Sequence, residues 1–124
     1  MKPEDFVSAV RRVWLANALD RYKRILTDTP RNPAADTVWQ KQILPCWDTL
    51  DDRQRDGVLK FVRLAMVETI SDMFVLVDNL GGFNEFRDKF HLVYGDECER
   101  VSGDLLDYFL AAEEDDPAEI KWQS

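Results

Sequence analysis

The chain has 124 residues, 45% of them hydrophobic and 32% charged, with a formal net charge of −8 at pH 7. This length and composition fit one globular domain, residues 1–124, and exclude a disordered chain. The acidic balance disfavours nucleic-acid binding, which depends on basic surface, and no apolar run reaches the roughly 18 residues that a membrane span needs.

The first predicted element is a helix that begins at Pro3 and ends near Thr27. Proline suits the first helical turn, and Glu4 and Asp5 complement the positive end of the helix dipole. Apolar residues recur on two sides of the segment, which indicates packing on both sides. The stretch 28–36 contains two prolines and is predicted to be a loop.

A second, shorter helix is predicted from Val38 to Leu44. Pro45 is expected to kink or end it, because proline lacks the N–H that an interior turn requires. Thr49 is then placed to cap a third helix, which should stop at the glycine pair 81–82. At about residues 50–80, this third helix would be the longest element and the centre of the fold.

The segment 84–94 fits either a helix or a short strand, and we favour the helix. Asp96 is expected to cap a fifth helix, whose inward face carries these residues: Cys98, Val101, Leu105, Tyr108, Phe109 and Ala112. The tail, 115–124, either frays or docks through Ile120 and Trp122. The sequence thus predicts an all-α protein, a single compact bundle of about five helices around a long central helix.

Two of the predicted helices carry polar residues in apolar faces. On a wheel of about 100° per residue, Asp72 lies inside the edge of the apolar face of the third helix, and Glu68 lies just outside it. Asn17 and Arg21 lie within an apolar stripe of the first helix. Because an unpaired interior charge costs several kcal/mol, we predict a buried Arg21–Asp72 ion pair. The alternative is a ligand-binding or enzymatic pocket built from these four residues.

Ligands for a metal or cofactor are scarce in the chain. His91 is the single histidine, and Cys46 and Cys98 lack the spacing of a zinc site. We expect no cofactor, no metal and no catalytic group, and two free thiols that are buried or half-buried. Free thiols and an N-terminus without the apolar core of a secretory signal favour a cytoplasmic protein.

The net charge is concentrated near the C-terminus. Of the 24 acidic and 16 basic residues, nine acids and one base, Arg100, lie in 96–116, so the remaining fifteen of each sign cancel. If the fifth helix turns its apolar residues inward, these carboxylates face solvent: Glu97, Asp104, Asp107, Glu114, Asp115 and Asp116. Clustered charge speeds encounter with an opposite charge. We therefore predict that they bind a basic protein partner, with a solubilising surface as the alternative.

Two further surfaces are candidates for binding. Trp39 and Trp47 flank Pro45 in a short connecting helix and form a secondary candidate patch. The third helix is apolar nearly all round, so a homodimer built on its second face is another alternative. In size, acidity, predicted helix content and lack of catalytic groups, the chain resembles small bacterial inhibitor and immunity proteins. That resemblance rests on general properties, and it implies neutralisation of a basic toxin such as a nuclease.

Overall fold

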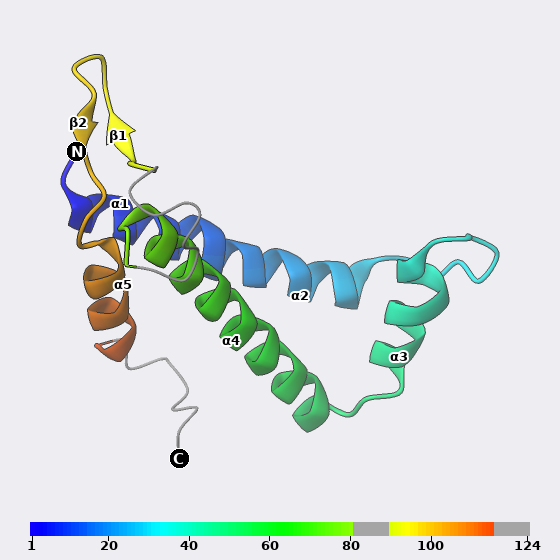
Figure 1. Cartoon of the computed structure of the whole chain (residues 1–124). Helices are drawn as coiled ribbons and strands as arrows, with labels where there is room; N and C mark the ends of the chain where they lie inside the picture. Colours follow the sequence, from blue (N-terminus) through cyan, green and yellow to red (C-terminus); the bar gives the residue numbers. More distant parts are fainter. Residues whose placement is uncertain (81–89, 116–124) are drawn as a thin grey trace.

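The computed structural model describes residues 1–80 and 90–115 and shows a mostly helical chain with one small two-stranded sheet. The all-α prediction is confirmed at that level, whereas a compact bundle of five helices around a central one is not confirmed. In Figure 1 the two long helical segments meet beside α5 and separate toward α3, which spans their far ends. The long helices therefore enclose a core at one end and leave a more open region at the other.

The N-terminal helical run comprises α1 (Pro3–Val10), η1 (Arg11–Asn17) and α2 (Ala18–Asp28), and η1 has π-helical hydrogen bonding. The predicted helix from Pro3 to about Thr27 is thus confirmed. Thr29 is extended and ends the run. Local signals fixed both ends, because Pro3 occupies the first turn and Pro30 cannot continue a helix.

The second helical run comprises η2 (Trp39–Ile43) and α3 (Leu44–Asp48). It does not end at Pro45, which lies in the first turn of α3. There the change from π to α hydrogen bonding accommodates the missing N–H. Arg31 holds the preceding loop to α3, with its Nε 2.8 Å and its Nη2 2.7 Å from the two carboxylate oxygens of Asp48.

The long helix is α4 (Asp52–Val77), and Asp51 is its N-cap. The side chain of Asp51 accepts a hydrogen bond from the Gln54 N–H, and the Gln54 side chain accepts one from the Asp51 N–H. This reciprocal capping box satisfies two N–H groups of the first turn. The prediction that Thr49 is the cap was wrong, because its hydroxyl donates to the Cys46 carbonyl instead.

At its C-terminal end, α4 stops before the predicted glycine pair. Asn79 is left-handed, with φ of 60°. The Leu80 N–H donates to the Val75 carbonyl at 2.9 Å, and the Asn79 N–H donates to Leu76 at 3.3 Å. This is a Schellman motif with asparagine in the place that glycine usually takes. The glycines 81–82 lie outside the described residues.

A short hairpin lies where helix was expected. Strands β1 (Val93–Tyr94) and β2 (Glu99–Arg100) pair antiparallel. The turn between them places Gly95 and Cys98 at positive φ, and the Cys98 N–H donates to the Gly95 carbonyl. The helix predicted over 84–94 is therefore wrong for 90–94, and 84–89 lie outside the described residues. The fifth helix, α5 (Leu105–Glu114), begins nine residues after Asp96, its expected cap.

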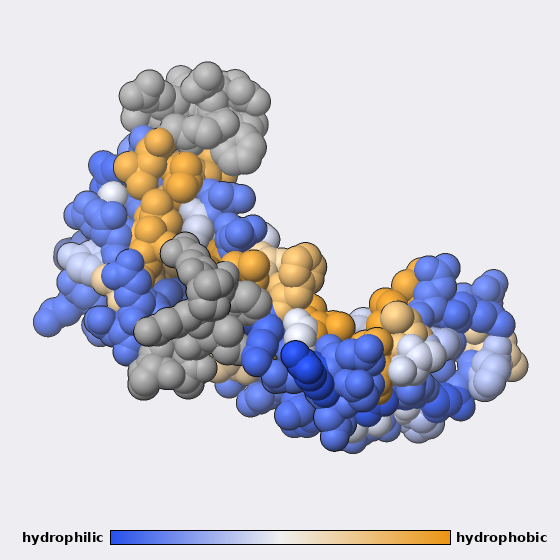
Figure 2. Space-filling view, turned by 90° about the horizontal axis from the view of Figure 1, so that it is seen from below, coloured by the Kyte–Doolittle hydropathy of each residue, from blue (hydrophilic) through white to orange (hydrophobic). Residues whose placement is uncertain are grey.

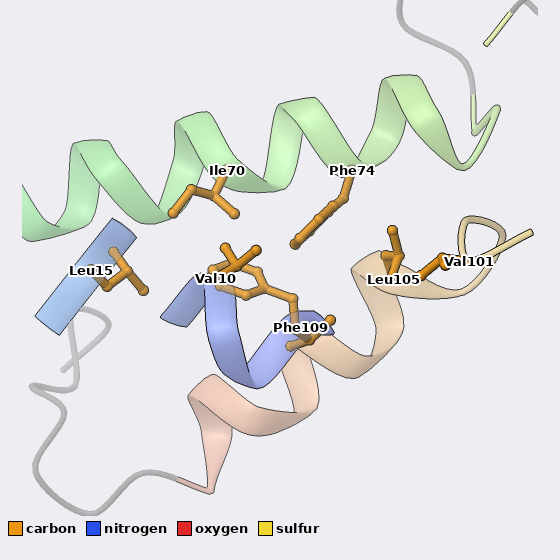
Figure 3. Packing of buried hydrophobic residues seen from close by; sticks show 8 residues of the cluster. Val10, Leu15, Ile70, Phe74, Val101, Leu105 and Phe109 are labelled. Atoms are coloured by element: carbon orange, nitrogen blue, oxygen red, sulfur yellow. The ribbon is translucent and has the colours of Figure 1, made fainter. Parts of the chain in front are cut away.

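The main core joins α1, η1, α4 and α5 with the strand-to-helix connection. Its buried side chains are Val7, Val10, Leu15, Ile70, Phe74, Val101, Leu105 and Phe109. Figure 3 shows Ile70 and Phe74 directed from α4 toward Val10 and Phe109. The Phe74 and Phe109 rings meet edge to face, with centroids 5.4 Å apart. A smaller second cluster, Leu26, Leu44 and Trp47, holds α3 at the far end.

Candidate functional site

An acidic surface forms where α5 packs along α1. Glu4 of α1 lies beside Tyr108 of α5, and Asp104 and Asp107 are close enough to act on the same phenol. A hydrogen bond to Glu4 and the negative charges of all three carboxylates raise the pKa of Tyr108 above its usual value. Tyr108 is 36% exposed, so the prediction that it faces inward was wrong. Three carboxylates, one from α1 and two from the N-terminal end of α5, thus lie near one exposed aromatic residue.

The predicted partner-binding residues are divided between α5, its two ends and the hairpin turn. Asp104 is the N-cap of α5, Asp107 lies in its first turn, and Glu114 and Asp115 lie at its C-terminal end. Glu97 lies in the hairpin turn rather than on a helix. All five are exposed, and Asp116 lies outside the described residues. We call Glu4, Asp104, Asp107, Tyr108, Glu114 and Asp115 the acidic surface.

Glu113, next to these residues, has a different environment. Its carboxylate accepts hydrogen bonds from Arg11 Nε at 2.9 Å and from Arg63 Nη1 and Nη2 at 2.9 and 3.1 Å. The Glu113 side chain is 12% exposed. One carboxylate therefore ties η1, α4 and α5 together. The sequence analysis counted Glu113 only among the nine acids of residues 96–116. Its pairing with Arg11 and Arg63 could not be predicted, because no sequence pattern relates residues so far apart in the chain.

A second carboxylate that sequence reasoning missed connects α4 to α5. Asp78, at the C-terminal end of α4, is 6% exposed. Its Oδ1 accepts the Gly103 N–H at 2.6 Å, and its Oδ2 accepts the Leu106 N–H at 2.8 Å. Asp78 thus caps the start of α5 from another helix, a role that the N-cap residue Asp104 does not fill with its own side chain. Asp78 therefore positions the first turn of α5, which contributes Asp107 to the acidic surface.

The predicted buried ion pair between Arg21 and Asp72 is not formed. Both residues are exposed, and the Arg21 guanidinium lies over the Tyr22 ring, 5.4 Å from its centroid. The antiparallel packing of the helices explains the error. Phe6 meets Phe74, whereas Tyr22 lines a hollow with residues near 59, so Arg21 and Asp72 are roughly ten residues apart along α4. At about 1.5 Å per residue, that separation is about 15 Å.

The alternative polar pocket also fails. Asn17 and Glu68 are exposed like Arg21 and Asp72, and no hydrogen bond or ion pair of the described residues joins any two of the four. The α4 face expected to be its main apolar face is also largely exposed, with Met73 at 48%. The core instead contains Ile70 and Phe74, on the other side of the helix.

The tryptophan patch corresponds to an apolar hollow. Trp39 is partly exposed and Trp47 is buried, and both line a hollow of about 450 Å³ between α2, α3 and α4. The other lining residues are Tyr22, Leu26, Gln42, Ile43, Cys46, Leu50, Val58, Leu59 and Val62. Figure 2 shows apolar residues gathered on the concave side of the molecule. Arg55 holds one wall, with its guanidinium 5.2 Å from the centroid of the Trp47 ring.

The described residues can also be compared with the requirements of a metal site, a disulfide and a membrane-spanning helix. Within residues 1–80 and 90–115, no three His, Cys, Asp or Glu side chains gather as metal ligands. Cys46 and Cys98 are free and exposed, so the expectation that they are buried was wrong. In the same ranges no helix has the length and apolar character needed to cross a membrane. No family model matches the chain, and the comparisons with curated proteins and with solved structures found no match either.

Proposed function

We propose that this protein binds a basic protein partner through the acidic surface. The observation that carries the proposal is that Glu4, Asp104 and Asp107 lie near Tyr108, where the packing of α1 against α5 brings like charges together. Such a field attracts a basic protein, and electrostatic steering speeds association roughly 10- to 1,000-fold. The exposed ring supplies apolar contact area of the kind that dominates protein interfaces.

The C-terminal end of α5 supports the same proposal. Glu114 and Asp115 lie at the negative end of the helix dipole, and the last turn contains no basic residue. An acid in that position costs a helix roughly 0.3–1 kcal/mol. Neither carboxylate is paired within the described residues, in contrast to Glu113. A basic partner would offset the cost of this unfavourable placement. Solubility alone does not require acids at the end of the helix, because a surface of mixed charges is equally soluble.

The partner that best fits is a basic protein whose own site binds polyanions. A nuclease toxin is the clearest example, since clustered carboxylates imitate phosphates, and the protein would then act as an inhibitor of the immunity type. Two exposed free thiols favour a reducing compartment such as the cytoplasm. In this proposal the protein is not an enzyme and needs no cofactor.

The experiment compares two charge-reversed variants with the same net charge. The first replaces Asp107, Glu114 and Asp115 with Lys, and the control replaces three exposed acids elsewhere, Asp20, Asp28 and Asp36. Basic proteins retained by the immobilised wild-type chain are identified, and their association rate constants are measured at increasing salt. We expect the first variant to associate at least about tenfold more slowly and the control to stay close to wild type. If association slows equally in both variants, the net charge of the protein explains the change in rate, and the acidic surface is not the binding site.

The apolar hollow favours a second candidate function, the binding of an apolar ligand. Its volume of about 450 Å³ lies within the roughly 300–1,000 Å³ of small-molecule sites. A thermal-shift screen of apolar small molecules tests this, with Val58→Arg as a variant that places a charge in the hollow. Stabilisation of wild type but not of the variant supports ligand binding. No stabilisation by any compound would refute it.

A further inference from the structure

The side of α4 that faces away from the core carries an exposed apolar face around Phe61. Figure 3 shows Ile70 directed from α4 into the core, and on a wheel of about 100° per residue Phe61 lies on the opposite side of the helix. Phe61 is 68% exposed, more than any other large hydrophobic side chain of the described residues. Val58 and Ala65, one turn to either side of it, are exposed as well. The described part of the chain therefore leaves this outer face of α4 uncovered.

Gly57, one turn before Phe61, gives a second indication of a partner at the outer face. Glycine inside a helix costs stability relative to alanine, and it is favoured where the backbone has a positive φ or where another backbone comes close. Neither reason applies within this chain. Gly57 lies inside α4, its φ is not positive, and a Cβ placed there would meet nothing within 4 Å. Close approach by a helix of another molecule would supply the reason.

The residues of the outer face are arranged symmetrically about Phe61. Gly57 and Ala65 lie four residues before and after it, and the exposed side chains of Arg53 and Glu68 lie eight before and seven after, on one flank of the face. Neither of these two charged groups has an ion pair or a side-chain hydrogen bond within the described residues. When a twofold axis relates two antiparallel helices, residues equally far before and after the axis face each other. The face is thus complementary to a second copy of itself.

We propose that the outer face is the interface of a homodimer, in which the α4 helices of two copies pack antiparallel across a twofold axis at Phe61. The two Phe61 rings meet at the centre, and Gly57 of each copy lies against Ala65 of the other. Arg53 and Glu68 form two equivalent ion pairs between the copies. A contact of about four helical turns is small, below the roughly 1,200 Å² of standard interfaces, so the dimer is transient, with a Kd in the micromolar range.

Sedimentation equilibrium of the full chain, from about 1 µM to about 1 mM, tests the proposal. We expect wild type to show a monomer–dimer equilibrium. Phe61→Ala should raise the Kd at least about tenfold, whereas Met73→Ala, a control at another exposed apolar side chain of α4, should leave it unchanged. A chain that stays monomeric throughout would leave the outer face to a different protein and overturn the homodimer. Equal effects of the two substitutions would also overturn it.

Gly57→Leu separates the interface from the stability of the fold. In the monomer the new side chain has open space, and leucine is a better helix former than glycine, so the monomer should be at least as stable as wild type in thermal denaturation. In the dimer the same side chain overlaps the approaching helix, so self-association should be lost. If Gly57→Leu dimerises like wild type, the two helices do not approach at Gly57 and the proposal is wrong.

An exchange of charges tests the antiparallel pairing. Arg53→Glu makes positions 53 and 68 both negative, and Glu68→Arg makes both positive, so each single variant should self-associate about tenfold more weakly. Mixed in equal amounts, the two single variants should form a heterodimer, because every facing pair then has opposite charges. If the mixture stays monomeric, the pairing about Phe61 is wrong. None of these residues belongs to the acidic surface, so failure of this proposal and failure of partner binding there are distinguishable.

Discussion

Replacing Glu113 with Ala should weaken the fold substantially, because this carboxylate pairs with two arginines from other helical segments. The substitution removes the acceptor of hydrogen bonds from Arg11 and Arg63, whose side chains are 22% and 14% exposed. Two guanidinium groups would then remain partly buried without their shared carboxylate. The polar connection that Glu113 makes between η1, α4 and α5 would be lost at the same time, and only the hydrophobic core would still join them.

The size of the effect follows from this burial. Breaking a fully buried ion pair from one side costs about 3–5 kcal/mol. Here each side chain keeps some contact with water, which lowers the expected loss to about 2–4 kcal/mol. Domains have total stabilities of about 5–15 kcal/mol, so this is a large fraction. It corresponds to a fall in Tm of about 5–15 °C.

Urea denaturation followed by circular dichroism measures this loss, with Glu114→Ala as the matched control. Glu114 is the exposed neighbour, and its removal should leave stability unchanged or raise it by up to about 1 kcal/mol, because it relieves an unfavourable interaction with the helix dipole. Arg63→Met combined with Glu113→Ala completes a double-mutant cycle, which should show a coupling energy of at least about 1 kcal/mol. If Glu113→Ala and Glu114→Ala denature at the same urea concentration, Glu113 does not tie the three helices together.

Three further predictions follow from individual side chains. Asp78→Ala removes the acceptor for the Gly103 and Leu106 amides, so it should cost about 1–3 kcal/mol, and unchanged hydrogen exchange at those amides would contradict this role. Because the pKa of Tyr108 is raised in the fold, its contribution to stability is present below about pH 10 and is lost as pH rises through the folded value. Glu4→Gln should lower the pKa of Tyr108 in an NMR titration, and an unchanged value would rule out the contact with Glu4. Asp72→Ala should leave stability within about 0.5 kcal/mol of wild type, since Asp72 is exposed, and a loss of several kcal/mol would restore the buried ion pair.

Local sequence signals were sufficient to predict the two long helical segments and α5, but not all of their ends and not the hairpin. The first helix was placed correctly because Pro3 and the proline loop after Asp28 act within a few residues of each end. At the end of α4, Asn79 takes the left-handed position before any glycine is reached. The hairpin was missed because hydrogen bonds between residues nine or ten positions apart stabilise it, and a helical or alternating pattern does not reveal them: the Leu92 carbonyl accepts the Val101 N–H, and the Leu92 N–H donates to Ser102 Oγ.

The candidate site was predictable only in part, for a physical reason. A helical wheel gives the side of a helix on which a residue lies, but not its level along a neighbouring helix. It therefore identified α5 carboxylates that are exposed in the structure, such as Asp107, and failed for Arg21 and Asp72. The contributions of Glu4 and Glu113 depend on which helices pack together. No spacing within the sequence contains that information.

The central claim is that a basic protein binds at the acidic surface, and its association rate constant with the captured partner tests the claim most directly. We expect the variant with Lys at positions 107, 114 and 115 to associate at least about tenfold more slowly than the control with Lys at positions 20, 28 and 36. This difference should shrink as salt screens exposed charges over about 8–10 Å. If the triple variant associates as fast as the control at low salt, the acidic surface does not bind the partner.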